Sequence, residues 1–221
     1  FDKWWHDHGN YKIFDHQYAI DNGYIPPDYR VWWGFEDDKL YEYAKEELND
    51  LSSQDKPFNL ILENADTHFP DGYKSENMTE EPFDSQYANV IHYSQGQIAQ
   101  FLEWCQQQPW YENTTIVVTG DHRSMDKNFF DGWDPNYERT IVNFYLNPAV
   151  PMPDEQHMQN RDFAPYDLFP TTLRAMGCTI EGDRAGLGTD LFSDTPTTIE
   201  TEGLDEVNTE LSKVQEGTPG A

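Results

Sequence analysis

The feature that most constrains the fold is an alternation of short apolar segments with longer amphipathic ones. Residues 58–62 (FNLIL) and 115–119 (TIVVT) have the length and apolar character of buried strands, and residues 140–146 (TIVNFYL) predict a third strand. Between the first two, residues 87–107 repeat apolar side chains at the spacing of a helix that faces a core. Alternating strands and helices favour an α/β fold, with a mostly parallel central sheet and helices on both faces.

The predicted domain covers residues 1–193. Its first part, residues 1–35, is rich in aromatic side chains and is interrupted by two adjacent prolines, so we expect an irregular segment there. Residues 194–221 are acidic and lack a sustained apolar period, which predicts a mobile tail that contributes little to stability. Further helices are predicted over residues 37–48 and 167–176, and a weak one over residues 204–211.

The chain is strongly acidic. Asp and Glu number 41 against 14 Lys and Arg, which gives a formal net charge of −27. Binding of nucleic acid requires clustered Lys and Arg, and the sequence has no such cluster, so nucleic acid is excluded as a partner. A surface of this kind favours solubility, and its field would also concentrate divalent cations.

No apolar run in the sequence approaches the roughly 20 residues that a membrane-spanning helix needs. The sequence opens inside the aromatic-rich segment and not with a secretory leader. We therefore expect that it is a fragment, and that a leader or membrane helices precede it in a longer protein.

The two cysteines, Cys105 and Cys178, do not have the spacing of a metal site. A disulfide between them and two separate thiols are both open at this point. Both cysteines lie in segments that are predicted to be buried, which favours separate thiols that pack as small apolar side chains.

Two of the predicted strands are followed by loops in which an aspartate is close to a histidine. Asp66-Thr67-His68 follows the strand at 58–62, and Gly120-Asp121-His122 follows the strand at 115–119. In α/β sheets ligands bind beyond the carboxyl ends of the strands, so parallel strands would bring both loops to one site. A carboxylate and an imidazole suit Mn, Zn or Fe better than Ca, and a glycine permits the sharp turn that directs both groups at one ion. The alternative is an aspartate that caps a helix beside a hydrogen-bonded histidine.

An ordered series of motifs decides between these interpretations. Between about residues 30 and 193 the chain resembles the sulfatase-like branch of the alkaline phosphatase superfamily, specifically the lipoteichoic acid synthases and related phosphoglycerol transferases. The matching pieces, in family order, are Trp33-Gly34-Phe35-Glu36-Asp37, Pro57-Phe58, Asp66-Thr67-His68-Phe69-Pro70, Tyr87-Ala88-Asn89-Val90-Ile91, Phe101-Leu102-Glu103-Trp104, Asn113-Thr114-Thr115-Ile116-Val117-Val118, Gly120-Asp121-His122, Arg139, Asp167-Leu168-Phe169-Pro170-Thr171-Thr172-Leu173 and Gly186-Leu187-Gly188-Thr189-Asp190-Leu191-Phe192.

The resemblance implies a role for five residues. Asp121 and His122 would be two ligands of a single divalent metal ion, commonly manganese in this family. His68 would lie in the substrate pocket, and Trp33 would either form a wall of that pocket or serve only in packing. Arg139 would bind phosphate through two parallel hydrogen bonds, or would pair with one of the many surface acids instead. The remaining histidines match no family site and are expected to be structural or exposed: His6, His8, His16, His92 and His157.

By the same resemblance, the whole enzyme would transfer glycerol phosphate from phosphatidylglycerol to a cell-envelope polymer or glycan, through a covalent threonine intermediate. It would work on the extracytoplasmic face of a bacterial membrane, to which N-terminal helices would anchor it. The family's threonine nucleophile and its accompanying metal-binding glutamate match no segment of this sequence. The chain alone is therefore expected to be inactive.

Two other kinds of function stay open at this point. One is a different activity of the same superfamily, such as phosphoethanolamine transfer or sulfate ester and phosphodiester hydrolysis. Those branches usually have Gly-Glu after the Asp-His pair, whereas Arg123-Ser124 follows here. The other is a non-catalytic glycan-binding fragment, which the aromatic residues of 1–35 could support.

Overall fold

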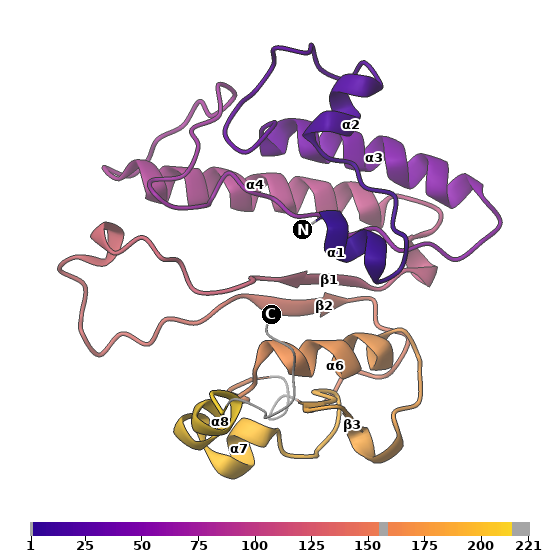
Figure 1. The fold of residues 1–221 in the computed structure, drawn as a ribbon, viewed down its shortest axis with the longest axis vertical. Helices are drawn as coiled ribbons and strands as arrows, with labels where there is room; N and C mark the ends of the chain where they lie inside the picture. The colour runs from indigo at the N-terminus through magenta and orange to yellow at the C-terminus, as the bar shows by residue number, and fades with distance from the viewer. Residues whose placement is uncertain (1, 155–158, 214–221) are drawn as a thin grey trace. The chain divides into compact units, whose positions relative to one another are not determined.

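The computed structural model describes residues 2–154 and 159–213 (Figure 1). The chain divides into two compact units. The first unit comprises residues 1–108 and 124–137, and the second comprises residues 109–123 and 138–221. Each unit is described separately below.

The first unit is built on two long helices that lie side by side, α3 (Asp37–Ser53) and α4 (Gln86–Gln106) (Figure 1). Each helix has a stripe of buried apolar side chains, as the helical spacing in the sequence predicted. The rings of Tyr41 on α3 and Phe101 on α4 lie 5.2 Å apart, centroid to centroid. Both predicted helices are confirmed, and the first continues beyond the predicted end to Ser53.

The aromatic-rich segment at the start of the chain is more regular than expected. It contains two six-residue helices, α1 (Asp2–Asp7) and α2 (His16–Asp21). Asp15 is the N-cap of α2, and its carboxylate accepts a hydrogen bond from the Tyr18 N–H at 2.8 Å. The ring of Phe14 lies 5.0 Å from that of Tyr24 and 5.2 Å from that of Tyr43, so aromatic packing joins this segment to α3.

Residues 58–62 differ from the sequence prediction. They are in no strand of the described part of the chain, and half-buried side chains alternate along them with exposed ones such as Asn59 and Ile61. That alternation is the period of an extended segment with one covered face, not of a strand buried on both faces. The prediction of a buried strand parallel to residues 115–119 is therefore wrong for the described residues, whose strand ladders are all antiparallel.

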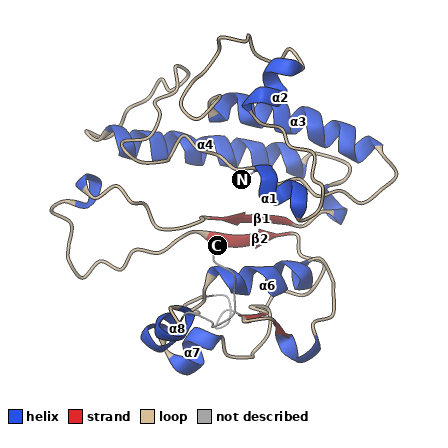
Figure 2. Cartoon of the chain, viewed as in Figure 1, coloured by secondary structure: helices blue, strands red, loops and turns tan. Residues whose placement is uncertain are grey.

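The second unit contains an antiparallel pair of strands, β1 (Ile116–Thr119) and β2 (Asn143–Leu146) (Figure 2). Their register pairs Ile116 with Leu146 and Thr119 with Asn143. The strand at 115–119 is confirmed but is half-buried, because a two-stranded ladder leaves more of each strand uncovered than a wide sheet does. The third predicted strand is shorter than expected, because residues 140–142 lie outside it.

Helix α6 (Leu168–Ala175) packs along this strand pair (Figure 2). The Ala149 N–H donates to the Ala175 carbonyl at 2.6 Å, and the Tyr145 and Thr172 hydroxyl oxygens lie 3.3 Å apart. Gly177 follows the helix with a φ of +89°, the left-handed conformation that commonly ends helices. The helix predicted over residues 167–176 is therefore confirmed, together with its glycine cap.

A buried carboxylate connects α6 to the segment that follows it. Asp167 is fully buried, and its two oxygens accept hydrogen bonds from the Thr189 N–H at 2.7 Å and from the Ala164 N–H at 2.8 Å. Thr189 belongs to the small strand pair β3 (Arg184–Ala185) and β4 (Gly188–Thr189). Two motifs of the resemblance, at residues 167–173 and 186–192, thus meet at one carboxylate.

The segment expected to be a mobile tail contains two helices among its described residues, 194–213. The Arg161 guanidinium donates to both carboxylate oxygens of Glu200, at 2.6 and 2.9 Å. The fully buried Thr197 and Glu200 form a reciprocal capping box, and Val207 is buried. The segment contains α7 (Thr198–Glu202) and α8 (Leu204–Leu211), the second of which has the predicted bounds.

Four short 3-10 helices complete the described elements: η1 (Tyr111–Asn113), η2 (Asn128–Phe130), η3 (Pro165–Asp167) and η4 (Glu181–Asp183). Within residues 2–154 and 159–213, no helix has the length and apolar character needed to cross a membrane. Both cysteines are free thiols. Cys105 is buried as expected, whereas Cys178 is exposed, because it follows the end of α6.

Candidate functional site

The structure brings His68 and Trp33, two of the predicted substrate-binding residues, into contact in the first unit. Their ring centroids are 4.3 Å apart, and the Trp33 side chain is 54% exposed. The Nδ1 atom of His68 lies 2.7 Å from the Phe69 carbonyl oxygen. Since a carbonyl can only accept, Nδ1 carries the proton, and the lone pair of a neutral His68 is on Nε2.

A tight turn at residues 31–34 positions Trp33. Val31 and Gly34 exchange both backbone hydrogen bonds, at 2.8 and 3.0 Å. The residue before Trp33 in this turn, Trp32, has a φ of +52°, and its indole N–H donates to the Ala65 carbonyl at 2.9 Å. That same carbonyl accepts the His68 N–H at 2.9 Å. One carbonyl therefore connects the tryptophan turn to the loop of His68.

Two buried aspartates hold the other side of the His68 loop. Asp37, at the start of α3, accepts hydrogen bonds from the N–H groups of Ala65 at 2.9 Å and Asp66 at 3.2 Å. In return, Oδ2 of Asp66 accepts the Asp37 N–H at 3.1 Å. Oδ1 of Asp66 is buried and has no hydrogen-bond partner in the described part of the chain. Two carboxylates in low dielectric repel each other, so this arrangement favours the uptake of one proton.

The pKa values follow from this geometry. Burial is the main cause and the neighbouring charge of Asp37 the second, and together they raise the pKa of Asp66 from 3.8 to about 7. Burial also raises the pKa of Asp37, against the two N–H hydrogen bonds that lower it. The pair is therefore expected to hold a proton in the folded state at pH values where the unfolded chain has lost it.

This difference predicts that stability depends on pH near neutrality. Because the folded-state pKa of Asp66 lies above its unfolded value, the free energy of unfolding rises as the pH falls from about 7 towards 4. One proton contributes at most about 1.4 kcal/mol per pH unit. Asp66→Asn imitates the protonated form, so we expect it to flatten this rise and to be more stable than the parent above pH 7. Urea unfolding at pH 5.5 and pH 8 measures both effects.

The exposed Asp55 provides the control, since Asp55→Asn should leave the pH profile parallel to that of the parent. A difference between Asp66→Asn and the parent that is the same at both pH values would contradict the proton-sharing pair.

The second predicted loop follows β1 in the second unit. Oδ1 of Asp121 accepts the His122 N–H at 2.8 Å, and Oδ2 lies 3.3 Å from Nε2 of His122. Nδ1 of His122 lies 2.9 Å from the Arg123 carbonyl oxygen, to which it must donate. The Nε2 lone pair of a neutral His122 is therefore beside a carboxylate oxygen, and both side chains are open to solvent.

The backbone around this loop differs in one respect from the prediction. Gly120 is not among the glycines with positive φ, so the loop does not depend on a left-handed turn there. Instead its missing side chain permits close packing, because an added Cβ would lie 3.3 Å from the Cβ of Ile141. The Gly120 N–H donates to the Val142 carbonyl at 2.9 Å, and this hydrogen bond extends the strand ladder by one residue. Arg139 therefore precedes β2 at the same end of the ladder at which Asp121 follows β1.

With the geometry of both loops established, comparison with known proteins decides the family. A family model described as sulfatase matches residues 1–178. The chain belongs to the sulfatase family. As a sulfatase-family chain it is 33% identical over 149 residues to phosphoglycerol transferase I of Citrobacter koseri, a match that covers 64% of the chain and 19% of that protein. It is 35% identical over 121 residues to phosphoglycerol transferase I of Escherichia fergusonii, and this match covers 51% of the chain and 16% of that protein.

A solved structure gives the fold. It is the crystal structure of a protein in the alkaline phosphatase superfamily from Vibrio parahaemolyticus, with a TM-score of 0.57, 23% sequence identity, and coverage of 81% of this sulfatase-family chain and 42% of the other. The predicted α/β fold class is therefore confirmed, and the sulfatase family model confirms the sulfatase-like family that the sequence resembles. The chain spans about a fifth of the length of the curated relatives it matches.

The donor atoms of Asp121 and His122 fit a divalent metal ion. Two ligands that each lie about 2.1 Å from an ion, at angles between octahedral and tetrahedral, are roughly 3.0–3.4 Å apart. Oδ2 of Asp121 and Nε2 of His122 are 3.3 Å apart. In the described parts of this sulfatase-family chain, no group of three or more His, Cys, Asp or Glu side chains could hold a metal, so the pair would supply two ligands of a larger set.

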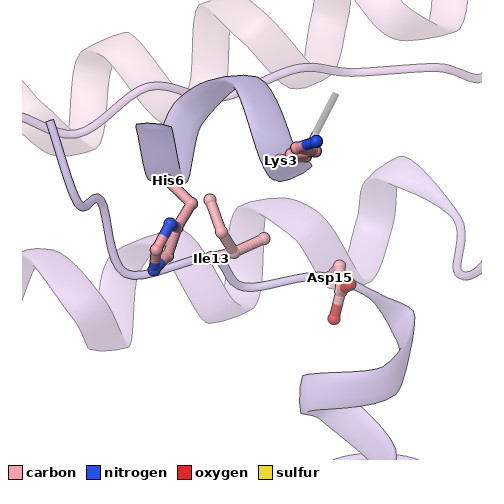
Figure 3. Close-up of a pocket in the computed structure, with 4 residues that line it drawn as sticks. All are labelled: Lys3, His6, Ile13 and Asp15. Atoms are coloured by element: carbon pink, nitrogen blue, oxygen red, sulfur yellow. The ribbon is translucent and has the colours of Figure 1, made fainter. Parts of the chain in front are cut away.

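The other histidines of the sulfatase-family chain behave as predicted where they are described. His16 is half-buried and hydrogen-bonds the Tyr29 carbonyl at 2.6 Å, and His8 stacks on Trp4. His92 is exposed beside Phe83, and His157 lies outside the described residues. His6 contributes to an open pocket of about 280 Å³ beneath α1, which Lys3, Ile13 and Asp15 also line (Figure 3). The Asp15 carboxylate there already caps α2.

Three residues that position the His68 loop were not predicted: Trp32, Asp37 and Asp66. In the sequence Asp37 stands as the last residue of the motif at 33–37, and in the structure its N–H donates to Oδ2 of Asp66. The available signal was that all three residues stand in or beside the motifs that matched the family, at residues 33–37 and 66–70. Whether the two histidine loops form one site stays a prediction.

Proposed function

We propose that this chain is part of the catalytic domain of a metal-dependent phosphoglycerol transferase. The enzyme would transfer glycerol phosphate from phosphatidylglycerol to a cell-envelope polymer or glycan, on the extracytoplasmic face of a bacterial membrane. The observation that carries the proposal is the 3.3 Å separation of Asp121 Oδ2 and His122 Nε2, in a sulfatase-family chain whose curated relatives are named phosphoglycerol transferases.

Asp121 and His122 would hold one divalent ion, for which we propose manganese. The Arg123 carbonyl fixes the His122 tautomer, so that Nε2 is available as a ligand. When bound, the ion would supply a Lewis acid that offsets negative charge on the phosphoryl oxygens and makes a nearby hydroxyl more acidic. Metal sites of this kind usually have at least three protein ligands, so a further ligand, a glutamate, would come from another part of the protein.

The proposed reaction has two displacements at phosphorus. In the first, a threonine oxygen from outside this chain attacks the phosphodiester, and the bond from phosphorus to the diacylglycerol oxygen breaks. In the second, an acceptor hydroxyl attacks the phosphorus, and the threonine oxygen leaves with a proton. Diacylglycerol and the glycerol-phosphate ester of the acceptor are the products.

His68 would act on the departing oxygen. Its Nδ1 proton is held by the Phe69 carbonyl, so Nε2 is the atom that can bind the substrate. In the imidazolium form, Nε2–H would donate a proton to the diacylglycerol oxygen as its bond to phosphorus breaks. The Trp33 ring, 4.3 Å from the imidazole, would support His68 and shield this proton from water.

Arg139 would bind a phosphoryl oxygen. Its planar guanidinium can donate two parallel hydrogen bonds to a phosphate, which a lysine cannot. Its place at the end of the strand ladder where Asp121 also lies supports this role.

The glycan-binding alternative based on residues 1–35 is weakened by how its aromatic side chains pack. The half-buried rings of Phe14, Tyr18 and Phe35 contact one another or the buried Tyr43. A different superfamily activity would be recognised by its substrate. The longer protein that includes this chain should release diacylglycerol from phosphatidylglycerol in a manganese-dependent reaction, and should not cleave an aryl sulfate at a comparable rate.

The role of His68 predicts a specific loss. In the longer protein that includes this chain, His68→Gln should lower the rate of diacylglycerol release by about 100-fold or more, the usual contribution of a general acid. Glutamine keeps a polar group at this position but cannot donate a proton. The exposed His92 is the matched control, and His92→Gln should keep the parent rate. Equal rates for His68→Gln and the parent would exclude the proposed acid.

A further inference from the structure

The segment between β1 and β2 carries a group of aromatic side chains that no role above uses. We call residues 124–137 the aromatic loop. Phe129 lies 5.0 Å from Phe130 and 5.5 Å from Trp133, and Trp133 lies 5.4 Å from Tyr137, measured between ring centroids. The Trp133 and Tyr137 side chains are 46% and 58% exposed. Continuous exposed aromatic surface of this kind typically marks a binding site.

The backbone of the aromatic loop is held by its own hydrogen bonds. The buried Asp126 accepts the Phe129 N–H at 3.1 Å, and Oδ1 of Asp134 accepts the Asn136 N–H at 2.8 Å. The Trp133 N–H donates to the Phe130 carbonyl at 3.2 Å, next to Gly132 with a φ of +80°. The exposed rings are thus presented by a preorganised backbone, which lowers the entropic cost of binding a ligand.

The aromatic loop is also attached to the segment that carries His68. The other oxygen of Asp126 accepts the Asp71 N–H at 3.0 Å, and Asp71 is three residues beyond His68. Tyr87 on α4 packs its ring 5.0 Å from that of Phe129, and its hydroxyl lies 2.7 Å from the Ser124 hydroxyl. All of these residues belong to the first unit. The carboxylate of Asp126 therefore joins the aromatic loop to the proposed substrate-binding segment.

The charges of the aromatic loop select the class of ligand. Asp131 and Asp134 are exposed beside the rings, and Lys127 is the single basic residue of the loop. Surfaces that bind anionic lipids combine aromatic residues with clustered Lys and Arg, so this one is unsuited to phosphatidylglycerol headgroups. A sugar ring, in contrast, offers a face of C–H groups that packs on an aromatic ring, and hydroxyl groups that donate to carboxylates.

We infer that the aromatic loop is a subsite for a neutral glycan, with Trp133 and Tyr137 as stacking surfaces and Asp131 and Asp134 as acceptors for sugar hydroxyls. The inference rests on the proposed function in one respect, since the glycan would be the acceptor of glycerol phosphate. The loop would hold it beside the segment of His68.

The test uses the longer protein that includes this chain and a panel of neutral linear glucose hexasaccharides of different linkages. Calorimetric titration of the parent should show binding of at least one hexasaccharide. Trp133→Ala should weaken that binding by about 10-fold or more, whereas Trp133→Phe should retain most of it. Trp4→Ala, which removes a similarly exposed tryptophan outside the loop, is the matched control. Thermal melting of each variant verifies that it is folded.

The outcomes separate this inference from the proposed function. No binding of any hexasaccharide by the parent, or equal binding by Trp133→Ala, would overturn the subsite, whatever the enzymatic activity. If Trp133→Ala loses binding to phosphatidylglycerol vesicles but keeps hexasaccharide binding, the aromatic loop is a lipid contact instead. In the transfer assay, Trp133→Ala should lose transfer to the hexasaccharide and keep the first displacement, which releases one equivalent of diacylglycerol per enzyme. A parent that binds the hexasaccharide but releases no diacylglycerol would contradict the proposed function alone.

Discussion

Replacing Asp121 or His122 with alanine in the longer protein is expected to lower glycerol-phosphate transfer by about 1,000-fold or more. Each side chain supplies one of two donor atoms that lie 3.3 Å apart, so either replacement leaves a single donor in this loop. The loss should be in kcat, since the ion is proposed to act on charge that develops during the displacement. Initial rates of diacylglycerol release at saturating manganese measure it.

The matched control is a second adjacent pair of the same residue types. His6 and Asp7 are exposed, with His6 Nδ1 3.5 Å from Asp7 Oδ1, but they follow no strand and match no family motif. His6→Ala and Asp7→Ala should keep the parent rate. Variants of Asp121 or His122 that turn over at the parent rate would show that catalysis does not use this loop.

The second large effect concerns the stability of the second unit. Gly188→Ala is expected to lower the free energy of unfolding by about 3 kcal/mol or more, the upper range for overpacked sites. An added Cβ would overlap the backbone carbonyl oxygen of Tyr166 and lie 3.0 Å from two ring carbons of Pro170. Neither neighbour can rotate away, and Tyr166 immediately precedes Asp167, whose carboxylate accepts the Thr189 N–H. Urea unfolding of the variant and the parent measures the difference.

Gly96 offers a control with the opposite sign. It lies inside α4, and an added Cβ there would meet no atom within 4 Å. Because alanine favours a helix over glycine by about 1 kcal/mol, Gly96→Ala should stabilise the chain. Equal stability of Gly188→Ala and the parent would mean that β4 does not pack against Tyr166 and Pro170 as described.

The two long helices could be predicted from the sequence because their signal is local. Apolar side chains recur along 37–48 and 87–107 at helical spacing, and packing of those stripes determines the structure. The strand predicted at 58–62 depended on a partner elsewhere in the chain, which an apolar run does not specify. The contact of Arg161 with Glu200 could not be predicted for a related reason, because the two residues are distant in sequence.

The candidate site divides in the same way. Asp121 and His122 are adjacent in sequence, so the short distance between their side chains could be anticipated from the residues themselves. Their proposed role as metal ligands was implied only by the family resemblance. The contact of Trp33 with His68 was anticipated only through the family resemblance. The exchange of hydrogen bonds between Asp37 and Asp66 spans 29 residues and was not predicted, because each aspartate alone resembles an ordinary surface acid.

Calorimetric titration with manganese tests the central claim most directly, since it reports on Asp121 and His122 without requiring turnover. The longer protein should bind one manganese ion, whereas the chain of 221 residues alone should bind it weakly, because it supplies two ligands. The double variant Asp121→Ala/His122→Ala of the longer protein should bind at least about 100-fold more weakly than the parent. Equally tight binding by the double variant would show that these two residues are not ligands and would contradict the proposed metal site.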